Sequence, residues 1–236
     1  HDSGDNGIQA EGGGAIVRSN LLVGPFGNKA FDSSHNVGTV SDLTVIHNTI
    51  LYSYGAGLKA WTGAPGQTNL VFANNAVYSQ ICGNLQGYTI WLPAGWTPGP
   101  AITIEGNVVY SYRCATAADA GTVNLATGFI LGNGAADFEN VTALNTPYTA
   151  IADYKPAAGG KLIANADRTW VVPADLLGNT PTAPYDAGAL DHAVPDTTPP
   201  TVAITFPGEG DILSGLVTIS ATASDDGSVA HVDFRI

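Results

Sequence analysis

Residues 70–82 read LVFANNAVYSQIC, an alternating apolar run, an Asn, a second short apolar run and a Cys. The same order returns in IVRSNLLVGP from Ile16, in LTVIHNTILYS from Leu43 and in ITIEGNVVYSYRC from Ile102. Apolar residues stand three and five positions before each central Asn, and this alternation is that of a strand with one buried face. The repeated residues are Asn20, Asn48, Asn75 and Asn107.

A second pattern interleaves with the first and keeps a constant order with it. A repeat of about 30 residues that contains several short strands and turns but no helix is typical of one coil of a parallel β-solenoid. We expect the repeated Asn at a turn, where Asn tolerates a left-handed backbone, and in a ladder with the Asn of the next coil. Chance recurrence in a Gly- and Asn-rich chain is the alternative. The second pattern consists of GIQAE from Gly7, GNKAF from Gly27, GLKAW from Gly57, GYTIW from Gly87 and, more weakly, GTVNL from Gly121.

Two copies of the first pattern end in Cys. Cys82 and Cys114 stand at equivalent positions after Asn75 and Asn107. Equivalent positions on successive coils are about 4.8 Å apart, and disulfides join Cα atoms roughly 4.4–6.8 Å apart. We therefore predict a disulfide between Cys82 and Cys114, and with it an oxidising, extracellular compartment. Two unrelated buried thiols are the alternative.

The composition favours an all-β protein and limits its partners. The 236 residues include 29 Gly and 14 Pro, only 12% are charged, and no segment has the capped 3.6-residue period of a long helix. A net charge of −12 argues against nucleic acid and anionic membranes as partners, because both need a basic patch. No apolar run approaches the roughly 18 residues of a membrane span. The sequence contains no Met, so we interpret it as a processed or excised piece of a longer protein.

From Ala152 the repeat gives way to ADYKPAAGGKLIANADRTWVVPADLLGNTPTAPYDAGALDH. This stretch resembles the closing segment of bacterial right-handed parallel β-helix proteins of the pectate-lyase-like superfamily, with its pattern DYxLxPGSPxIDAG, D, GNxR and DxGAxE. The Ser-Pro pair, the Arg and the final Glu of that pattern are missing or replaced. The resemblance covers about residues 7–192 and implies a right-handed parallel β-helix over residues 1–192, without implying an activity. The matching residues are 153–154, Pro156, 164–166, Asp175, 178–179 and 186–189.

The chain continues into a second, smaller unit. Residues 193–200, AVPDTTPP, form a Pro/Thr linker. Residues 201–236, with the two preceding prolines, resemble the start of a bacterial immunoglobulin-like module, in the signature PPTVxxxxPxxGxxxSGxVxxxAxAxD. Such a sandwich needs roughly 100 residues, so the strands visible here would leave an edge and an apolar face uncovered. Either the rest of the module was removed or is disordered, or a neighbouring copy adds the missing strands and builds a fibre.

Glycan binding is predicted from the second pattern. If its apolar residues point inward, the alternate residues point outward, and equivalent ones stack about 4.8 Å apart. A strip of Phe31, Trp61 and Trp91 beside charged side chains would let a sugar chain lie on its rings. Reversed parity, or loops folded over the rings, is the alternative. The predicted glycan-binding residues are Glu11, Lys29, Phe31, Lys59, Trp61, Trp91 and Trp96.

Catalysis has less support from the residues. Many β-helices of this kind are polysaccharide lyases, which abstract a proton beside a uronate carboxyl with Lys or Arg. If this chain is a lyase, Lys59 is the candidate base, because it is predicted to point outward beside Trp61. The Lys/Arg-rich motifs of lyases and the paired carboxylates of glycoside hydrolases are absent, however. A charge of −12 also repels polyanions. A solvated lysine is the plain alternative for Lys59.

The sequence therefore predicts a secreted or bacterial cell-surface β-helix that binds an extracellular polysaccharide or cell-surface glycan, or serves as a structural shaft, without chemistry of its own. The alternative is a fragment of a polysaccharide lyase or a related carbohydrate-active enzyme. Self-assembly through the incomplete immunoglobulin-like module is a further expectation. No cofactor is expected, apart from a calcium-stabilised turn at Asp2 and Asp5 in HDSGDNG, whose spacing differs from that of an EF-hand.

Overall fold

The computed structural model divides into two compact units, His1–His192 and Ala193–Ile236. The division falls after His192, where the sequence places the start of the linker. The structure describes residues 7–10, 13–26, 29–33, 41–53, 56–60, 69–79, 90–91, 102–111, 129–144, 148–192, 199–225, 229 and 231–235.

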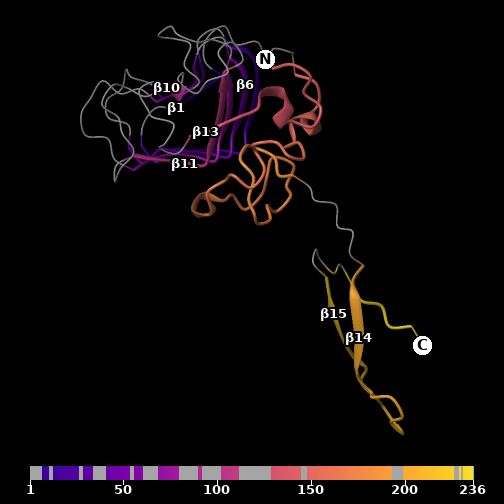
Figure 1. Ribbon diagram of the computed structural model, residues 1–236. Coiled ribbons are helices and arrows are strands. Elements are labelled where there is room, and N and C mark those ends of the chain that lie inside the picture. The colour runs from indigo at the N-terminus through magenta and orange to yellow at the C-terminus, as the bar shows by residue number, and fades with distance from the viewer. Residues whose placement is uncertain are drawn as a thin grey trace. The chain divides into compact units, whose positions relative to one another are not determined.

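The described strands of the first unit form three parallel sheets, which successive strands of the chain visit in turn (Figure 1). Each strand pairs in parallel with its counterpart from the next repeat, so the strands are the rungs of a repeating array. The first sheet contains β1 (Ile8–Ala10), β4 (Lys29–Ser33), β7 (Ala56–Ala60) and β10 (Ile90–Trp91). The second contains β2 (Ile16–Arg18), β5 (Thr44–Ile46), β8 (Leu70–Ala73) and β11 (Ile102–Glu105). The third contains β3 (Leu21–Phe26), β6 (Thr49–Ser53), β9 (Ala76–Ser79), β12 (Asn107–Ser111) and β13 (Phe129–Leu131).

The repeated apolar residues form a core between the sheets. Val45, Phe72 and Ile104 occupy paired positions on neighbouring strands of the second sheet, and all three are buried. Ile50 and Val77 do the same on the third sheet and belong to the same cluster. The prediction that these positions share the inward face is confirmed. Burying one apolar side chain per strand in every repeat favours this register, because a shift of one residue would turn the whole row outward.

The four repeated asparagines form a ladder at the corner between the second and third sheets. The Nδ2 of Asn20 donates to Asn48 Oδ1 (2.8 Å), that of Asn48 to Asn75 Oδ1 (2.9 Å), and that of Asn75 to Asn107 Oδ1 (2.9 Å). Each acceptor oxygen also receives the backbone N–H of the preceding Asn. The ladder therefore supplies side-chain partners where the chain turns from one sheet to the next.

The left-handed residue at this corner is not the ladder Asn, which corrects the sequence prediction. It is the residue just before each one. The residues of this corner column, and their φ angles, are Ser19 (52°), His47 (50°), Asn74 (58°) and Gly106 (63°). The ladder asparagines keep ordinary backbone angles, and their amides are left to bond along the ladder.

The register of the first sheet differs from the one expected from the glycines. Phe31 pairs with Leu58, and Leu58 pairs with Ile90, so Trp91 stands beside Lys59. Phe31 is 1% exposed and belongs to the core, so its assignment to an outward glycan-binding strip is wrong. Alignment of GNKAF with GLKAW sets Asn28 opposite Leu58, where it is the exception to the inward apolar pattern. The observed register puts a phenyl ring there instead, because burial of the larger apolar side chain decides the pairing. Phe31 and Trp91 therefore stand in different columns.

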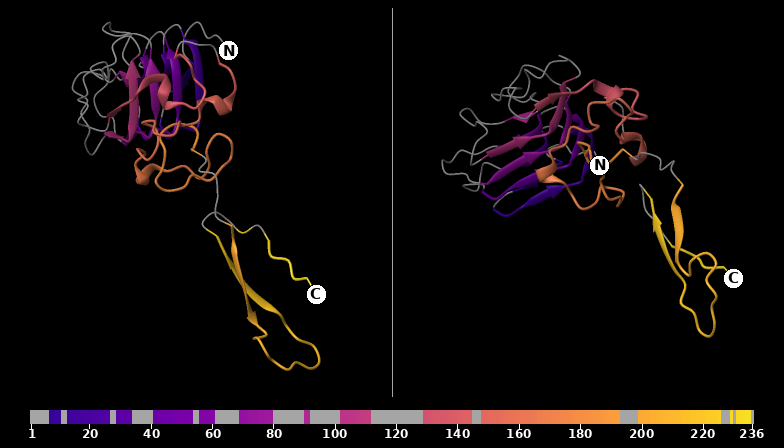
Figure 2. Two further views of the ribbon diagram at one scale, coloured as in Figure 1. Left: turned by 45° about the vertical axis from the view of Figure 1, so that its right-hand side comes forward. Right: turned by 60° about the horizontal axis from the view of Figure 1, so that its bottom comes forward.

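Residues 132–192, the covering segment, fold back over the outer faces of the second and third sheets (Figure 2). The described residues of this segment, 132–144 and 148–192, contain three short 3₁₀ helices and little other regular structure. Tyr154, Leu162 and Leu190 are buried against outward residues of the third sheet, among them Tyr78. Among the described residues no helix is long and apolar enough to cross a membrane. The 3₁₀ helices are η2 (Gly134–Asp137), η3 (Ile151–Tyr154) and η4 (Arg168–Trp170).

The second unit contains the antiparallel pair β14 (Thr201–Phe206) and β15 (Ser220–Ser224). Val202, Ile204 and Phe206 are 65%, 65% and 46% exposed, and the pairing of β14 with β15 is irregular between Ile204 and Phe206. Uncovered apolar side chains, which the sequence predicts for this unit, are therefore present in its described part. A two-stranded pair of this kind is marginally stable by itself in water.

Candidate functional site

The corner column holds the covering segment in place. Ser19 Oγ donates to the carbonyl of Ala174 (3.3 Å), and the His47 ring lies 3.2 Å from the carbonyl of Gly188. Asn74, one repeat further, bonds to the segment as well. Three residues of this column therefore contact a segment far away in sequence.

His47 acts here as a neutral structural group. The Nδ2 of Asn74 lies 3.0 Å from His47 Nε2 and can only donate, so Nε2 accepts. The proton then sits on Nδ1 and is donated to the carbonyl of Gly188. Burial lowers the pKa of His47 to about 4, so the ring stays uncharged at neutral pH.

Asn74 binds the backbone of the covering segment at two points. Its Oδ1 accepts from the Asp167 N–H (2.6 Å), and its Nδ2 donates to the Asp167 carbonyl (2.9 Å). Asn74 is fully buried, and we call this pair of bonds the Asn74 clamp. Gly106 leaves the space for it, because a Cβ at that position would overlap Asn74 Oδ1 and lie 2.7 Å from Asp167 N. The clamp thus positions the residues that follow Asp167.

Those residues form η4 and carry two side chains toward the surface. The Asp167 carboxylate accepts from the Thr169 N–H (2.7 Å) and caps the turn. Arg168 is exposed, whereas Trp170 is partly buried against the outward residues Val71 and Ala73 of β8. A groove lies beside each of these two side chains.

The Trp170 groove has a volume of about 270 Å³. Its floor is the outer face of the second sheet, where Thr44, Val71 and Thr103 follow one another across three strands. At its edge Asn69 Nδ2 donates to Asp42 Oδ1 (2.8 Å). An indole beside hydroxyl, amide and carboxylate groups offers an apolar face and polar partners at once. The lining residues are Asp42, Thr44, Asn69, Leu70, Val71, Thr103 and Trp170.

The Arg168 groove is larger, at about 570 Å³. Three alanines and Pro184 give it an apolar lining, and Tyr185 adds a partly exposed phenol. Within the part of the chain that the structure describes, no carboxylate forms an ion pair with Arg168. The lining residues are Ala164, Ala166, Asp167, Arg168, Ala183, Pro184 and Tyr185.

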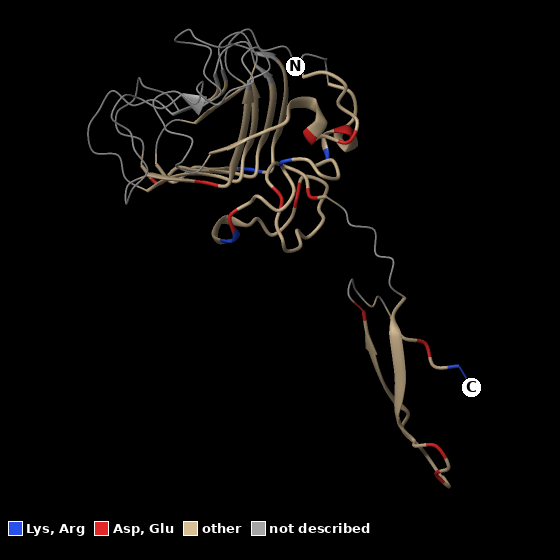
Figure 3. Cartoon of the chain, viewed as in Figure 1, with Lys and Arg blue, Asp and Glu red and all other residues tan. Residues whose placement is uncertain are grey.

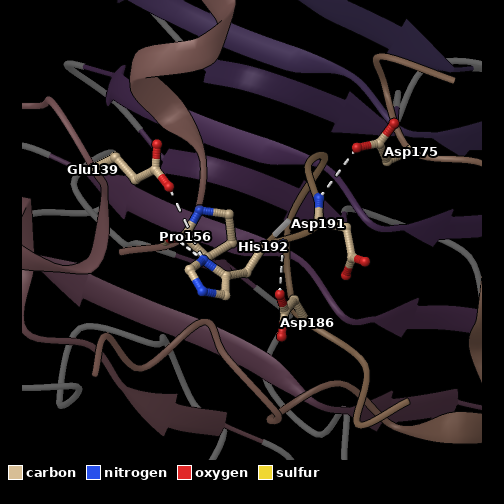
Figure 4. A network of polar contacts seen from close by, with 6 residues as sticks. All are labelled: Glu139, Pro156, Asp175, Asp186, Asp191 and His192. Carbon is tan, nitrogen blue, oxygen red and sulfur yellow. Dashed lines mark hydrogen bonds and ion pairs between the residues drawn. The ribbon is translucent and has the colours of Figure 1, made fainter. Parts of the chain in front are cut away.

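A separate network of carboxylates at the end of the covering segment has a structural role (Figure 4). Asp186 accepts from the N–H groups of Ala164 (2.9 Å) and His192 (2.7 Å). Asp175 accepts from the Asp191 N–H (3.3 Å). It also accepts from the N–H groups of Leu177 and Asn179 in the turn that follows Asp175. The matches to the closing-segment pattern at Asp175 and Asp186 are thus residues that fix backbone turns.

This network has no room for a substrate. The cavity beside it, which His47 also lines, measures about 10 Å³ and holds at most about one water molecule. Desolvation, with the charges of Asp186 and Asp175, raises the pKa of Asp191 from 3.8 to about 6. No group of side chains suited to a metal ion is found among the described residues. We therefore assign the network to stability.

Charge is unevenly distributed in the first unit. Figure 3 shows that its strands are largely uncharged and that most of its described Lys, Arg, Asp and Glu residues lie in the segment after β13. The groove beside Arg168 belongs to that segment.

The structure identifies candidate site residues that the sequence analysis missed. Several of the predicted site residues lie outside the described part of the chain. Trp170 and Arg168 lie outside the repeat, so the repeated pattern gives no sign of them. The available signal was the sequence DRT at residues 167–169, an Asp two residues before the N–H that it caps. Lys29, Lys59 and Trp91 are placed by backbone pairing alone. Outside the described residues lie Asp2, Asp5, Glu11, Trp61, Cys82, Trp96 and Cys114.

The comparisons with known proteins concern the second unit. A family model described as a bacterial Ig domain matches residues 200–236. No curated protein and no solved structure matches the chain. The immunoglobulin-like resemblance of the C-terminal residues is therefore supported, and for the first unit the geometry carries the argument.

Proposed function

We propose that this chain is a secreted or cell-surface bacterial protein whose first unit binds a glycan in the Trp170 groove and has no catalytic chemistry of its own. The first unit is then a right-handed parallel β-helix of the pectate-lyase-like kind, closed by its covering segment. Three parallel sheets visited in constant order support this fold. The Ig match supports the location, because Ig modules are common in bacterial surface proteins.

One observation carries the proposal, the position of Trp170. Its ring is held over the outer face of a rigid sheet, next to Asp42, Asn69 and Thr103. Sugars present alternating apolar C–H faces and hydroxyl groups, so an aromatic ring beside short polar side chains complements them. The volume of about 270 Å³ lies just below the usual range for drug-sized ligands and suits a sugar ring that rests on a surface.

The Asn74 clamp makes the site preorganised. Asn74 fixes both backbone groups of Asp167, and its Nδ2 also lies 3.3 Å from the Trp170 carbonyl. A ring that is already held in place loses little freedom on binding, and this raises affinity for the same contacts.

The test is glycan binding by the full chain and by matched aromatic variants. An array of plant, bacterial and algal oligosaccharides identifies a ligand, and calorimetry measures its Kd. We expect Trp170→Ala to weaken binding about tenfold, equivalent to about 1.4 kcal/mol. Tyr148→Ala is the control, because Tyr148 is an exposed aromatic residue that stacks on Tyr154 away from the groove.

Three results would overturn the proposal. The first is an absence of binding across the array, and the second is an equal loss of affinity in the two variants. The third is release of unsaturated, ultraviolet-absorbing products from uronate polymers, which would establish the polysaccharide lyase alternative. Loss of such activity in Lys59→Ala would then assign the base.

A further inference from the structure

We infer that the Arg168 groove binds an isolated acidic substituent, a carboxylate or a sulfate ester, on the same glycan that lies against Trp170. This inference rests on the proposed function and names the class of glycan. It also limits that class to chains with sparse acidic groups.

The two grooves lie beside one short element. Arg168 and Trp170 are two residues apart in η4, and a 3₁₀ helix rises about 2 Å per residue. Arg168 lines one groove and Trp170 the other. Their side chains leave η4 about 120° apart around its axis, so a glycan that rests on the indole has to follow the surface of η4 over several sugar units to meet the guanidinium. The Asn74 clamp holds the backbone of Asp167, the residue just before η4.

Arg168 has the chemistry for an anion. Its planar guanidinium donates two parallel hydrogen bonds to a carboxylate or sulfate. Within the described residues it has no ion-pair partner, and it is exposed at a groove whose lining is mostly Ala and Pro. Asp167 lines the same groove, but its carboxylate already accepts the Thr169 N–H. Tyr185 offers a ring and a hydroxyl for the sugar that carries the acid.

Net charge decides between a sparse acid and a polyanion. The chain carries −12, so every additional acidic group of a bound polymer meets the field of the whole protein. One acidic group placed at Arg168 gains a local partner, whereas a uronate on every sugar would add repulsion without adding partners. The glycan that we expect to bind is therefore a mostly neutral chain with occasional acidic branches or esters.

The experiment compares matched glycans on the full chain. An array carries neutral oligosaccharides, each beside the same backbone with one glucuronic acid or one sulfate ester, together with polygalacturonate. Where a neutral oligosaccharide binds, we expect its counterpart with one acidic group to bind about tenfold more tightly. The reason is the charge-assisted, bidentate hydrogen bonding of a guanidinium to an acid. The preference should shrink with added salt because the group is exposed.

Variants separate Arg168 from general charge effects. Arg168→Gln should remove the acidic preference and leave neutral binding unchanged, and Arg168→Lys should keep part of the preference. Arg18→Gln is the control, since Arg18 is exposed on β2 and lines neither groove. Neutral glycans that bind through Trp170 with no acidic preference would overturn this inference and leave the proposed function standing. Tightest binding to polygalacturonate would also overturn it, and no binding to any glycan would overturn both.

Discussion

Replacing Asn75 by Ala should destabilise the first unit far more than the same change at the end of the ladder. The Asn75 side chain makes four hydrogen bonds. Its Nδ2 donates to Val45 O and to Asn107 Oδ1, both at 2.9 Å. Its Oδ1 accepts from Asn48 N (3.0 Å) and from Asn48 Nδ2 (2.9 Å). Asn75 is fully buried, so water does not replace these partners.

The magnitude follows from the number of buried groups that lose a partner. A typical intramolecular hydrogen bond contributes about 1 kcal/mol, and a buried group left without a partner costs about 1–3 kcal/mol. Four bonds, some of them to groups with a second partner, give an expected loss of about 3–5 kcal/mol for Asn75→Ala. Asn20 is only partly buried, and its Nδ2 bonds to Arg18 O and Asn48 Oδ1 can be replaced by water. Asn20→Ala should cost about 1 kcal/mol.

Urea unfolding followed by tryptophan fluorescence measures this difference. The chain has four Trp residues, and all of them precede residue 193, so the signal reports on the first unit alone. We expect a clearly lower midpoint for Asn75→Ala than for Asn20→Ala, with similar m-values. Equal losses in the two variants, or a loss below about 1 kcal/mol at Asn75, would refute the ladder as a source of stability.

Four further predictions concern other parts of the chain. Gly106→Ala should lower stability by about 1–3 kcal/mol and weaken glycan binding, since the methyl group would enter the Asn74 clamp at a left-handed position; unchanged unfolding and binding would contradict this. The folded-state pKa of Asp191 is raised from 3.8 to about 6, so its ionisation costs stability as pH rises through that window. Asp191→Asn should therefore stabilise the protein at pH 7, by about 1 kcal/mol after allowance for its half-exposed side chain, and change little near pH 4; a gain of equal size at both pH values would show that the titration is not the cause. The unreduced protein should have a mass lower by two hydrogen atoms than the reduced one if Cys82 and Cys114 are bonded, and reduction should cost on the order of 3–4 kcal/mol, whereas two alkylatable thiols would rule the bond out. Residues 200–236 should be cleaved readily by protease in a monodisperse monomer, and filaments with a protected C-terminal unit would instead indicate strand addition by a neighbouring copy.

Much of the first unit could be read from local pattern alone. Strand parity around the repeated Asn identified Val45 and Phe72 as inward residues, and both are fully buried. The same spacing predicted the ladder, because equal positions in successive coils come within hydrogen-bonding reach. These features depend on residues within one repeat and on the repetition itself, both of which are visible in the chain.

The pairing of the first sheet and the candidate site were decided by tertiary structure. Alignment of the shared glycines predicts one strand register, whereas the structure has another, with Phe31 buried opposite Leu58. Packing of the apolar core decides the register, and alignment of identical residues does not. Trp170 became a candidate because Asn74, in a different part of the chain, holds the backbone of Asp167. An all-β, repeating chain with an Asn ladder follows from the order of residues in each repeat, because those properties recur at short range. Only the folded chain could show which outer face the covering segment occupies and which side chains meet there, because contacts between distant residues have no periodicity in the sequence.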